Sequence, residues 1–338
     1  MPEAPHPGRV VAVQADVQYQ PAEVAGQCVR ITAGRESAAQ PAYAQPSYAL
    51  PWCTSPGEPA SDDTGRLLVV VHGALRDAGN YLRHAQAAAG PEPASRTLIV
   101  APQFLADVDL GGRAEPWPGT LYWDAEGWKG GEQSLGAPGI SSFAVMDALL
   151  EQLTAAGPGP AGASAGRPPE VVIFGNSAGG QYVNRYAAVS RGPGRLAGRG
   201  IAVRFVISNP STYLYFTANR PGPGGAGVNR WRYGFDDAPG YVQGSAAENL
   251  RRYLDRDVTI VLGREDSDGA SLLLETGPAA MAQGANRYER GVRYHAYVSE
   301  LAGAEGLEAR HQLIELEGVG HSAADVMAAE PVREILFG

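Results

Sequence analysis

The sequence predicts an α/β fold with an open, mostly parallel sheet, and two observations carry that prediction. Short segments rich in β-branched residues recur along the chain, and several of them are continuously apolar. Continuous apolar runs are typical of parallel strands that are covered on both faces. Segments with apolar residues at helical spacing separate these runs, and the alternation indicates an open α/β sheet. We expect about eight strands, with helices on both faces of the sheet.

The expected strands share this apolar, β-branched composition. They lie at residues 9–17, 28–32, 67–71, 98–101, 171–174, 203–207, 258–262 and 312–316. No clear helical segment separates the first two strands, so we expect the leading edge of the sheet to be antiparallel. Helical spacing of apolar residues is clearest at 141–155 and 178–190.

The chain is expected to form one domain. Its 338 residues exceed the usual length of a domain, but α/β folds often reach this size as a single unit. Segments rich in Gly, Pro, Ala or Ser at 41–63, 157–169 and 221–227 are predicted loops. Residues 1–65 are expected to supply edge strands and a loop. The aromatic-rich segment 211–255 interrupts the alternation of strands and helices, and we interpret it as a small cap or lid.

Composition and charge exclude several classes of protein. The formal net charge is −9, and an acidic chain lacks the basic surface that nucleic-acid binding requires. Lys129 is the only lysine, which leaves almost no candidate for lysine-based catalysis. Cys28 and Cys53 are too few for a disulfide scaffold or a cysteine-rich metal site, although they could form one bridge in an exported protein. We expect no metal and no cofactor, because the sequence shows no metal-ligand cluster, phosphate-binding loop or dinucleotide fingerprint.

No segment of the sequence has the pattern of a membrane span or a secretion signal. The N-terminus lacks a basic stretch followed by an apolar one, and no apolar run approaches about 18 residues. We therefore expect a cytoplasmic protein without a membrane span, with export as the alternative if a leader peptide was removed. The sequence does not indicate the oligomeric state.

The sharpest chemical signal is the motif GNSAG at residues 175–179, which lies between an expected strand and an expected helix. A serine at such a tight turn needs small neighbours, because other segments of the chain pass close to it. The turn lifts the hydroxyl of Ser177 out of the sheet and points the first N–H groups of the helix toward the space beside it. The motif predicts a nucleophile. A purely structural turn is the alternative in a chain this rich in Gly and Ala.

A nucleophilic serine needs a base within hydrogen-bonding distance and a group that orients the base. His321 is the candidate base, because it follows the last expected strand and a Gly-Val-Gly turn that could hold an imidazole over the ends of the strands. The acid is expected just after the strand at 258–262. Asp266 is our first choice there, and Asp268 and Glu265 are the alternatives.

Stabilisation of a developing oxyanion needs two hydrogen-bond donors that point to one position. The backbone N–H of Ala178, directly after the serine, is one candidate. The other is the N–H of Ala74, in a loop where Gly73 allows the backbone to turn inward. His72, in the same loop, is expected to form structural hydrogen bonds. The histidines outside these two loops are expected to be solvated or to have ordinary structural partners.

These motifs together resemble the α/β-hydrolase superfamily. A strand followed by His-Gly, the GNSAGG turn, the GRED acid loop and the GVGHS histidine occur in the order serine, acid, histidine that this fold uses. The resemblance covers about residues 66–338. It implies an α/β-hydrolase fold in which Ser177, Asp266 and His321 form a catalytic triad. The interval between the acid and the histidine is longer than we expect, so residues 281–308 should hold extra helical structure.

The resemblance implies a serine hydrolase that cleaves a small-molecule carboxylic ester through an acyl-enzyme intermediate. The alternatives are an amidase or peptidase, an acyltransferase, or a hydrolase of C–C bonds with the same triad, because one fold serves many chemistries. A non-catalytic ligand-binding homologue is the alternative from another class. Candidate pocket residues are Trp123, Tyr213 and Trp231, which follow expected strands; packing of loops onto the core is the other interpretation of these side chains.

Overall fold

The structure is a computed structural model, and the statements that follow concern the residues that it describes. These are residues 22–32, 47–55, 65–90, 96–112, 115–155, 157–158, 164–165, 170–307 and 310–338. The strand expected at residues 9–17 lies outside the described residues.

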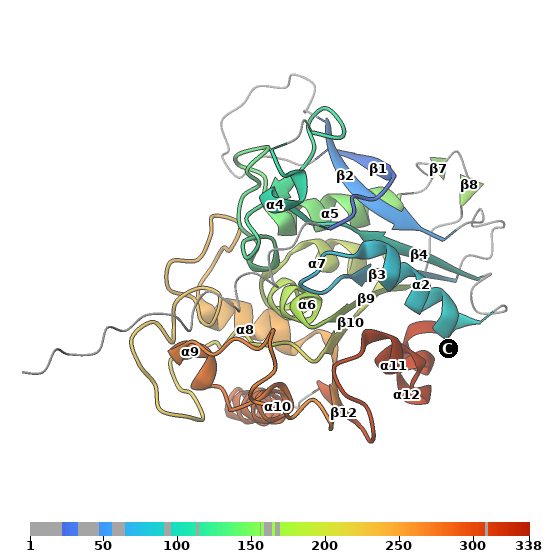
Figure 1. Ribbon diagram of the computed structural model, residues 1–338. Helices are drawn as coiled ribbons and strands as arrows, with labels where there is room; N and C mark the ends of the chain where they lie inside the picture. The colour runs from blue at the N-terminus through green and yellow to red at the C-terminus, as the bar shows by residue number, and fades with distance from the viewer. Residues whose placement is uncertain are drawn as a thin grey trace, which may run out of the picture.

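An eight-stranded sheet runs through the centre of the described structure (Figure 1). Its strands, in spatial order, are β1 (Gln27–Thr32), β2 (Ser47–Thr54), β4 (Thr97–Pro102), β3 (Arg66–Val71), β9 (Glu170–Asn176), β10 (Ala202–Ser208), β11 (Asp257–Gly263) and β12 (Gln312–Leu316). The pairs β1–β2 and β2–β4 are antiparallel, whereas the other pairs are parallel. The predicted mostly parallel sheet is therefore confirmed. Its antiparallel edge is formed among the described residues by β1, β2 and β4, and β2 was not among the expected strands.

Strand β2 corrects the prediction of a continuous loop at 41–63. Proline inside a short segment argues against a strand, because it cannot donate a hydrogen bond to a neighbour. Here Pro51 is accommodated, since β4 pairs with β2 only at residues 52–54. The side chains of Tyr48 and Leu50 are buried in the core. Cys28 on β1 and Cys53 on β2 are free thiols.

Helices cover both faces of the sheet (Figure 1). They are α2 (Ala78–Ala89), α4 (Asp107–Leu110), α5 (Ser142–Leu153), α6 (Ala178–Val189), α7 (Gly192–Ala197), α8 (Ala246–Leu254), α9 (Pro278–Met281), α10 (Arg287–Ala304), α11 (Ala323–Ala328) and α12 (Glu330–Phe337), with a 3-10 turn η1 (Trp128–Gly130) and the two-residue strands β5 (Leu105–Ala106), β6 (Tyr122–Trp123), β7 (Gly157–Pro158) and β8 (Ser164–Ala165). The predicted helices at 141–155 and 178–190 are confirmed as α5 and α6.

Successive residues of β3 belong to two different cores. Val69 and Val71 pack in the core that includes α5, α6, α8 and α10, whereas Leu68 and Val70 pack in the core that includes α2, α11 and α12. Because successive side chains of a strand point to opposite faces, both faces of β3 need apolar residues. This burial explains the continuous apolar sequence of the strand.

The register of the parallel strands brings their carboxyl ends to one edge of the sheet. Val71 on β3 pairs with Gly175 on β9, which pairs in turn with Ile207 on β10. Ser208 pairs with Val261 on β11. The segments that follow these strands therefore leave the sheet at the same edge, which is where open α/β sheets bind ligands.

The aromatic-rich segment 211–255 has two parts. Residues 211–245 contain no helix or named strand, and α8 then connects to β11 while it packs against α6.

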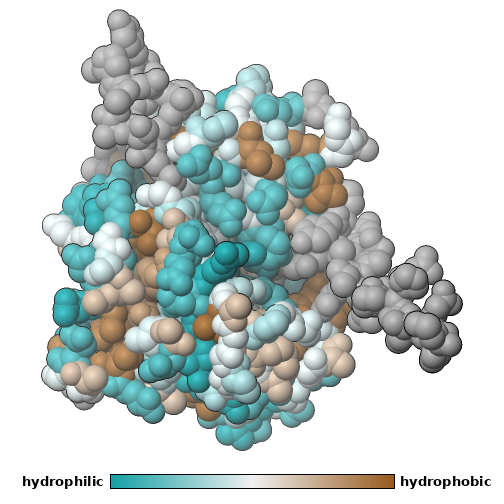
Figure 2. All heavy atoms as spheres, turned by 90° about the vertical axis from the view of Figure 1, so that its left-hand side faces the viewer, coloured by the Kyte–Doolittle hydropathy of each residue, from teal (hydrophilic) through white to brown (hydrophobic). Residues whose placement is uncertain are grey.

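Figure 2 shows the side of the molecule that lies at the left of Figure 1, with hydrophilic side chains down its middle and apolar side chains gathered beside them. The role of 211–255 as a lid stays a prediction.

Extra helical structure does lie between the acid loop and the last strand, as the length of that interval predicted. The short helix α9 precedes the 18-residue helix α10. Among the helices in the described ranges, none is long and apolar enough to cross a lipid bilayer.

Candidate active site

Ser177 occupies a sharp turn between β9 and α6. Its backbone has φ 61° and ψ −120°, in the left-handed half of conformational space that non-glycine residues rarely adopt. The turn is tight because neighbouring chains touch its glycines: a Cβ on Gly179 would overlap the carbonyl oxygen of Val71, and one on Gly175 would overlap the carbonyl oxygen of Gly179. These contacts explain why small residues flank the serine in the sequence.

The imidazole of His321 lies beside this serine, although 144 positions separate the two in the sequence. The distance from His321 Nε2 to Ser177 Oγ is 2.9 Å. Two asparagine side chains hold the histidine loop, since Asn176 donates to the carbonyl of His321 and Asn209 donates to the carbonyl of Gly320. The imidazole is therefore fixed from the ends of two neighbouring strands, β9 and β10.

The carboxylate of Asp266 contacts the other nitrogen of the imidazole. Its Oδ2 lies 2.6 Å from Nδ1 of His321, and the side chain is 4% exposed. A carboxylate at this position accepts a hydrogen bond from the Nδ1–H group and so fixes the tautomer in which Nε2 can accept the serine proton. Of the other acids considered, Asp268 accepts a hydrogen bond from the backbone of Ala270, and Glu265 is exposed. Of these three acids, Asp266 is therefore the one whose carboxylate contacts the imidazole of His321.

The loop after β3 lies next to the serine. A Cβ on Gly73 would sit 3.8 Å from the Cβ of Ser177. His72 fixes this loop, because its Nε2 accepts from the N–H of Phe104 at 2.9 Å and its Nδ1 therefore donates to the carbonyl of Gly73. Burial lowers the pKa of His72 to about 4, so the ring is neutral at pH 7 and its role is structural, as predicted. On the other side of the serine, Ala178 begins α6, where an N–H has no acceptor within the helix.

The same loop is anchored by an ion pair that the sequence did not predict. Arg76 Nε lies 2.7 Å from Asp109 Oδ2, and Arg76 Nη2 lies 2.9 Å from Oδ1 of the same carboxylate. Both side chains are almost completely buried. Arg76 also donates to the carbonyl of Ala74 at 2.7 Å. The fork therefore ties the loop that carries Ala74 to α4; no motif or periodicity links the two residues in the sequence.

Solved structures match this chain, whereas no protein-family model and no curated protein does. Poly(aspartic acid) hydrolase-1 from Sphingomonas sp. KT-1 is 21% identical over 94% of this chain and 100% of its own, with a TM-score of 0.61. LpqC, a poly(3-hydroxybutyrate) depolymerase from Bordetella parapertussis, is 25% identical over 83% of this chain and 81% of its own, with a TM-score of 0.59. The protein has the α/β-hydrolase fold. The fold implied by the sequence resemblance is confirmed.

The aromatic side chains that the sequence suggested for a pocket lie in different surroundings. Trp123 and Tyr213 are fully buried in the main core, where Tyr213 stacks on Tyr294 at 4.3 Å between ring centroids. Neither buried ring presents a surface to a ligand. Both side chains pack in the core, which was the alternative interpretation of the sequence. Trp231 is only partly buried, and its indole donates to the carbonyl of Gly130 at 2.7 Å.

A cluster of partly and fully buried charges links α6 with the loops that carry Lys129, Arg232 and Glu275. Lys129 Nζ lies 2.9 Å from Glu126 and 3.5 Å from Glu275, although the lysine side chain is only 2% exposed. Arg232 pairs with Glu126 at 2.8 Å. Arg185 on α6 donates to the carbonyl of Lys129. The cluster connects the segment around η1 with the loops after β10 and β11.

This cluster predicts an acid-sensitive contribution to stability. Burial alone would raise the pKa of Glu275, but Lys129, Arg185 and Arg232 together lower it from 4.5 to about 2. A carboxyl group whose pKa falls on folding stabilises the protein above its unfolded pKa, and that stabilisation is lost as pH falls from about 4.5 to about 2. We expect the Glu275→Gln variant to lack a pH-dependent contribution to the free energy of unfolding that changes by about 2 kcal/mol between pH 6 and pH 3, measured by urea unfolding. Glu305→Gln, which changes an exposed ion pair with Arg251, is the matched control; an equal effect in both variants would contradict the prediction.

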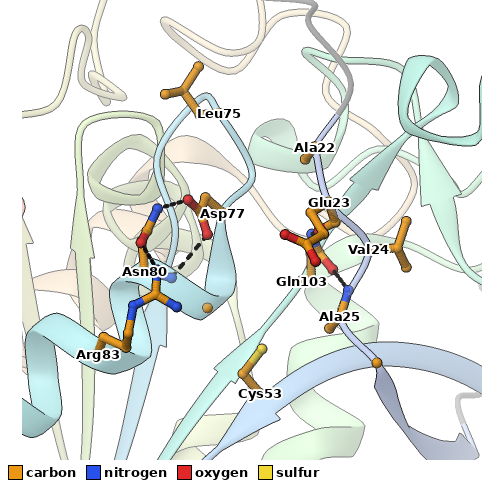
Figure 3. A pocket seen from close by; sticks show the side chains of 12 residues that line it. Ala22, Glu23, Val24, Ala25, Cys53, Leu75, Asp77, Asn80, Arg83 and Gln103 are labelled. Carbon is orange, nitrogen blue, oxygen red and sulfur yellow. Dashed lines mark hydrogen bonds between the residues drawn. The ribbon is translucent and has the colours of Figure 1, made fainter.

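A cavity of about 490 Å³ lies at the start of α2, and Figure 3 shows its lining. Asp77, Asn80 and Arg83 form one wall in this view, and residues 22–25 lie opposite, with Cys53 below. None of the predicted site residues lines this cavity, although Leu75, directly after Ala74, does.

Proposed function

We propose that this α/β-hydrolase is a serine hydrolase that cleaves carboxylic esters through an acyl-enzyme intermediate. The row of hydrogen bonds from Asp266 through His321 to Ser177 is the observation that carries the proposal. Such a row supplies a nucleophile, a base for its proton and a carboxylate that orients the base. The strained turn that lifts Ser177 from the sheet supports the same assignment.

In the proposed reaction the oxygen of Ser177 attacks the ester carbonyl carbon while His321 Nε2 takes the serine proton. The N–H groups of Ala178 and Ala74 stabilise the resulting oxyanion. When the tetrahedral intermediate collapses, the imidazolium gives its proton to the departing alcohol, and the acyl group stays on Ser177. Water then attacks the acyl-enzyme while the imidazole takes a proton from that water. When this second intermediate collapses, the imidazolium returns the proton to the Ser177 oxygen and the carboxylic acid is released. Asp266 remains ionised and stabilises the imidazolium throughout.

The names of two structural neighbours support hydrolysis of an ester or amide bond. One neighbour is a depolymerase of poly(3-hydroxybutyrate), and the other is a hydrolase of poly(aspartic acid). The second name favours amide hydrolysis as the alternative for this chain, because poly(aspartic acid) is linked by amide bonds. The same triad serves both reactions, so the leaving group must be tested directly.

A matched set of chromogenic substrates tests the proposal. The wild-type protein is expected to release p-nitrophenol from acyl esters with a higher kcat/KM than it releases p-nitroaniline from the corresponding anilides. The value of kcat/KM should fall at acid pH, because a protonated imidazole cannot accept the serine proton. Preference for the anilides would favour an amidase. No turnover of either series would contradict the proposed hydrolase and favour a binding protein.

A further inference from the structure

We infer that Arg287 is a positioning residue for the proposed triad, because its guanidinium holds the oxygen of Asp266 that His321 does not. The inference rests on the proposed function and adds a fourth member to the row of side chains. Arg287 Nη1 lies 3.3 Å from Asp266 Oδ1, whereas Oδ2 of the same carboxylate faces His321. Arg287 is fully buried, so water does not screen this contact.

The first turn of α10 also holds the backbone of the acid. Arg287 is the first residue of this helix, and the N–H of the next residue, Tyr288, donates to the carbonyl of Asp266 at 3.2 Å. The guanidinium itself is held by the hydroxyl of Ser271, at 2.9 Å from Nη1. One helix start therefore fixes both the carboxylate and the main chain of Asp266. This helix is the extra structure that lengthens the interval between the acid and the histidine.

The hydrogen bonding of Arg287 is unusual for a residue whose role is only to stabilise the fold. Its Nε and Nη2 are buried and have no hydrogen-bond partner among the described residues. A buried donor that is left without a partner destabilises the folded state. Arg290, three positions further along α10, donates from Nε to the carbonyl of Gly284 and from Nη1 to that of Ser211. Arg290 is thus satisfied by the fold, whereas Arg287 directs its charge at the proposed acid.

Charges from the loop after β11 and from α10 surround the guanidinium. Asp266, Asp268 and Glu275 act on it from the loop, and Arg290 lies on its own helix. Burial lowers the pKa of Arg287 and the Asp266 carboxylate raises it again, so the group stays charged at neutral pH. Its positive charge offsets part of the field of Asp266 at His321. Without that charge the carboxylate would favour the protonated imidazole more strongly, and the base would be lost at a higher pH.

The pH dependence of kcat/KM distinguishes this role from a structural one. In Arg287→Met we expect the acidic limb of the profile to move up by about one pH unit, which lowers kcat/KM about tenfold at pH values below the limb. Arg287→Lys keeps the charge without the planar fork, so its limb should stay at the wild-type pH while kcat falls. If Arg287→Met does not fold, Arg287→Gln is used instead, with the same expected shift.

Arg290→Met is the matched control. It removes a buried positive charge from the same helix, but the Arg290 side chain does not contact Asp266. Its acidic limb is expected at the wild-type position, with folding of each variant checked by thermal unfolding. An unchanged limb in the neutral Arg287 variant, or an equal shift in Arg290→Met, would overturn the inference. Failure of the proposed function is distinguishable, because the wild type itself would then lack turnover and its serine would not react with a fluorophosphonate.

Discussion

Ser177→Ala is expected to lower kcat for p-nitrophenyl esters by about 10⁴–10⁶. The variant keeps the imidazole and the proposed oxyanion donors but has no oxygen to attack the carbonyl carbon. Members of a triad act as a unit, so the remaining residues cannot compensate. Steady-state kinetics together with the thermal unfolding midpoint would show that activity is lost while the fold is kept.

Ser299→Ala is the matched control for that variant. Ser299 lies on α10, and its hydroxyl donates to the carbonyl of His295 within the same helix. Its loss should leave kcat unchanged. Retention of near wild-type turnover in Ser177→Ala would show that another group performs the reaction.

Asp109→Ala is expected to reduce the free energy of unfolding by about 3–5 kcal/mol. The substitution leaves the guanidinium of Arg76 buried without the carboxylate that holds it through two hydrogen bonds. It also removes the acceptor of the Ala106 N–H at the start of α4. Urea unfolding measures the loss. We expect kcat/KM to fall as well, because Arg76 holds the carbonyl of Ala74 in the loop beside Ser177.

Asp107→Ala provides the comparison for Asp109, since it removes an exposed carboxylate from the same short helix. Surface substitutions of this kind usually change stability by about 0.5 kcal/mol or less. A loss in Asp109→Ala no larger than that of the control would contradict the assigned role of the buried pair.

The sequence contained enough local information to predict the parallel part of the sheet. Strands such as β3 and β9 are buried on both faces, and their continuous apolar sequences indicate this burial directly. Strand β2 was missed because Pro51 and the Pro- and Ser-rich residues around it have the composition of a loop. Its place depends on pairing with β1 and β4, which are distant in sequence.

The candidate site was predictable to the extent that its chemistry is local. A serine between small residues and a histidine after the last strand each carry a signal within a few positions. Arg76 and Arg287 carry none, because each acts through a partner that the fold brings to it from another segment. The aromatic residues were ambiguous for a related reason. Whether Trp123 or Tyr213 lines a pocket depends on burial, which residue type does not determine.

The most direct test of the proposed active site is the reaction of the protein with a fluorophosphonate, followed by peptide mass spectrometry. We predict a single adduct on Ser177 in the wild type, no adduct in Ser177→Ala, and much slower labelling in His321→Ala, because the base must take the serine proton. An unlabelled wild-type protein, or an adduct on a different residue, would contradict the account.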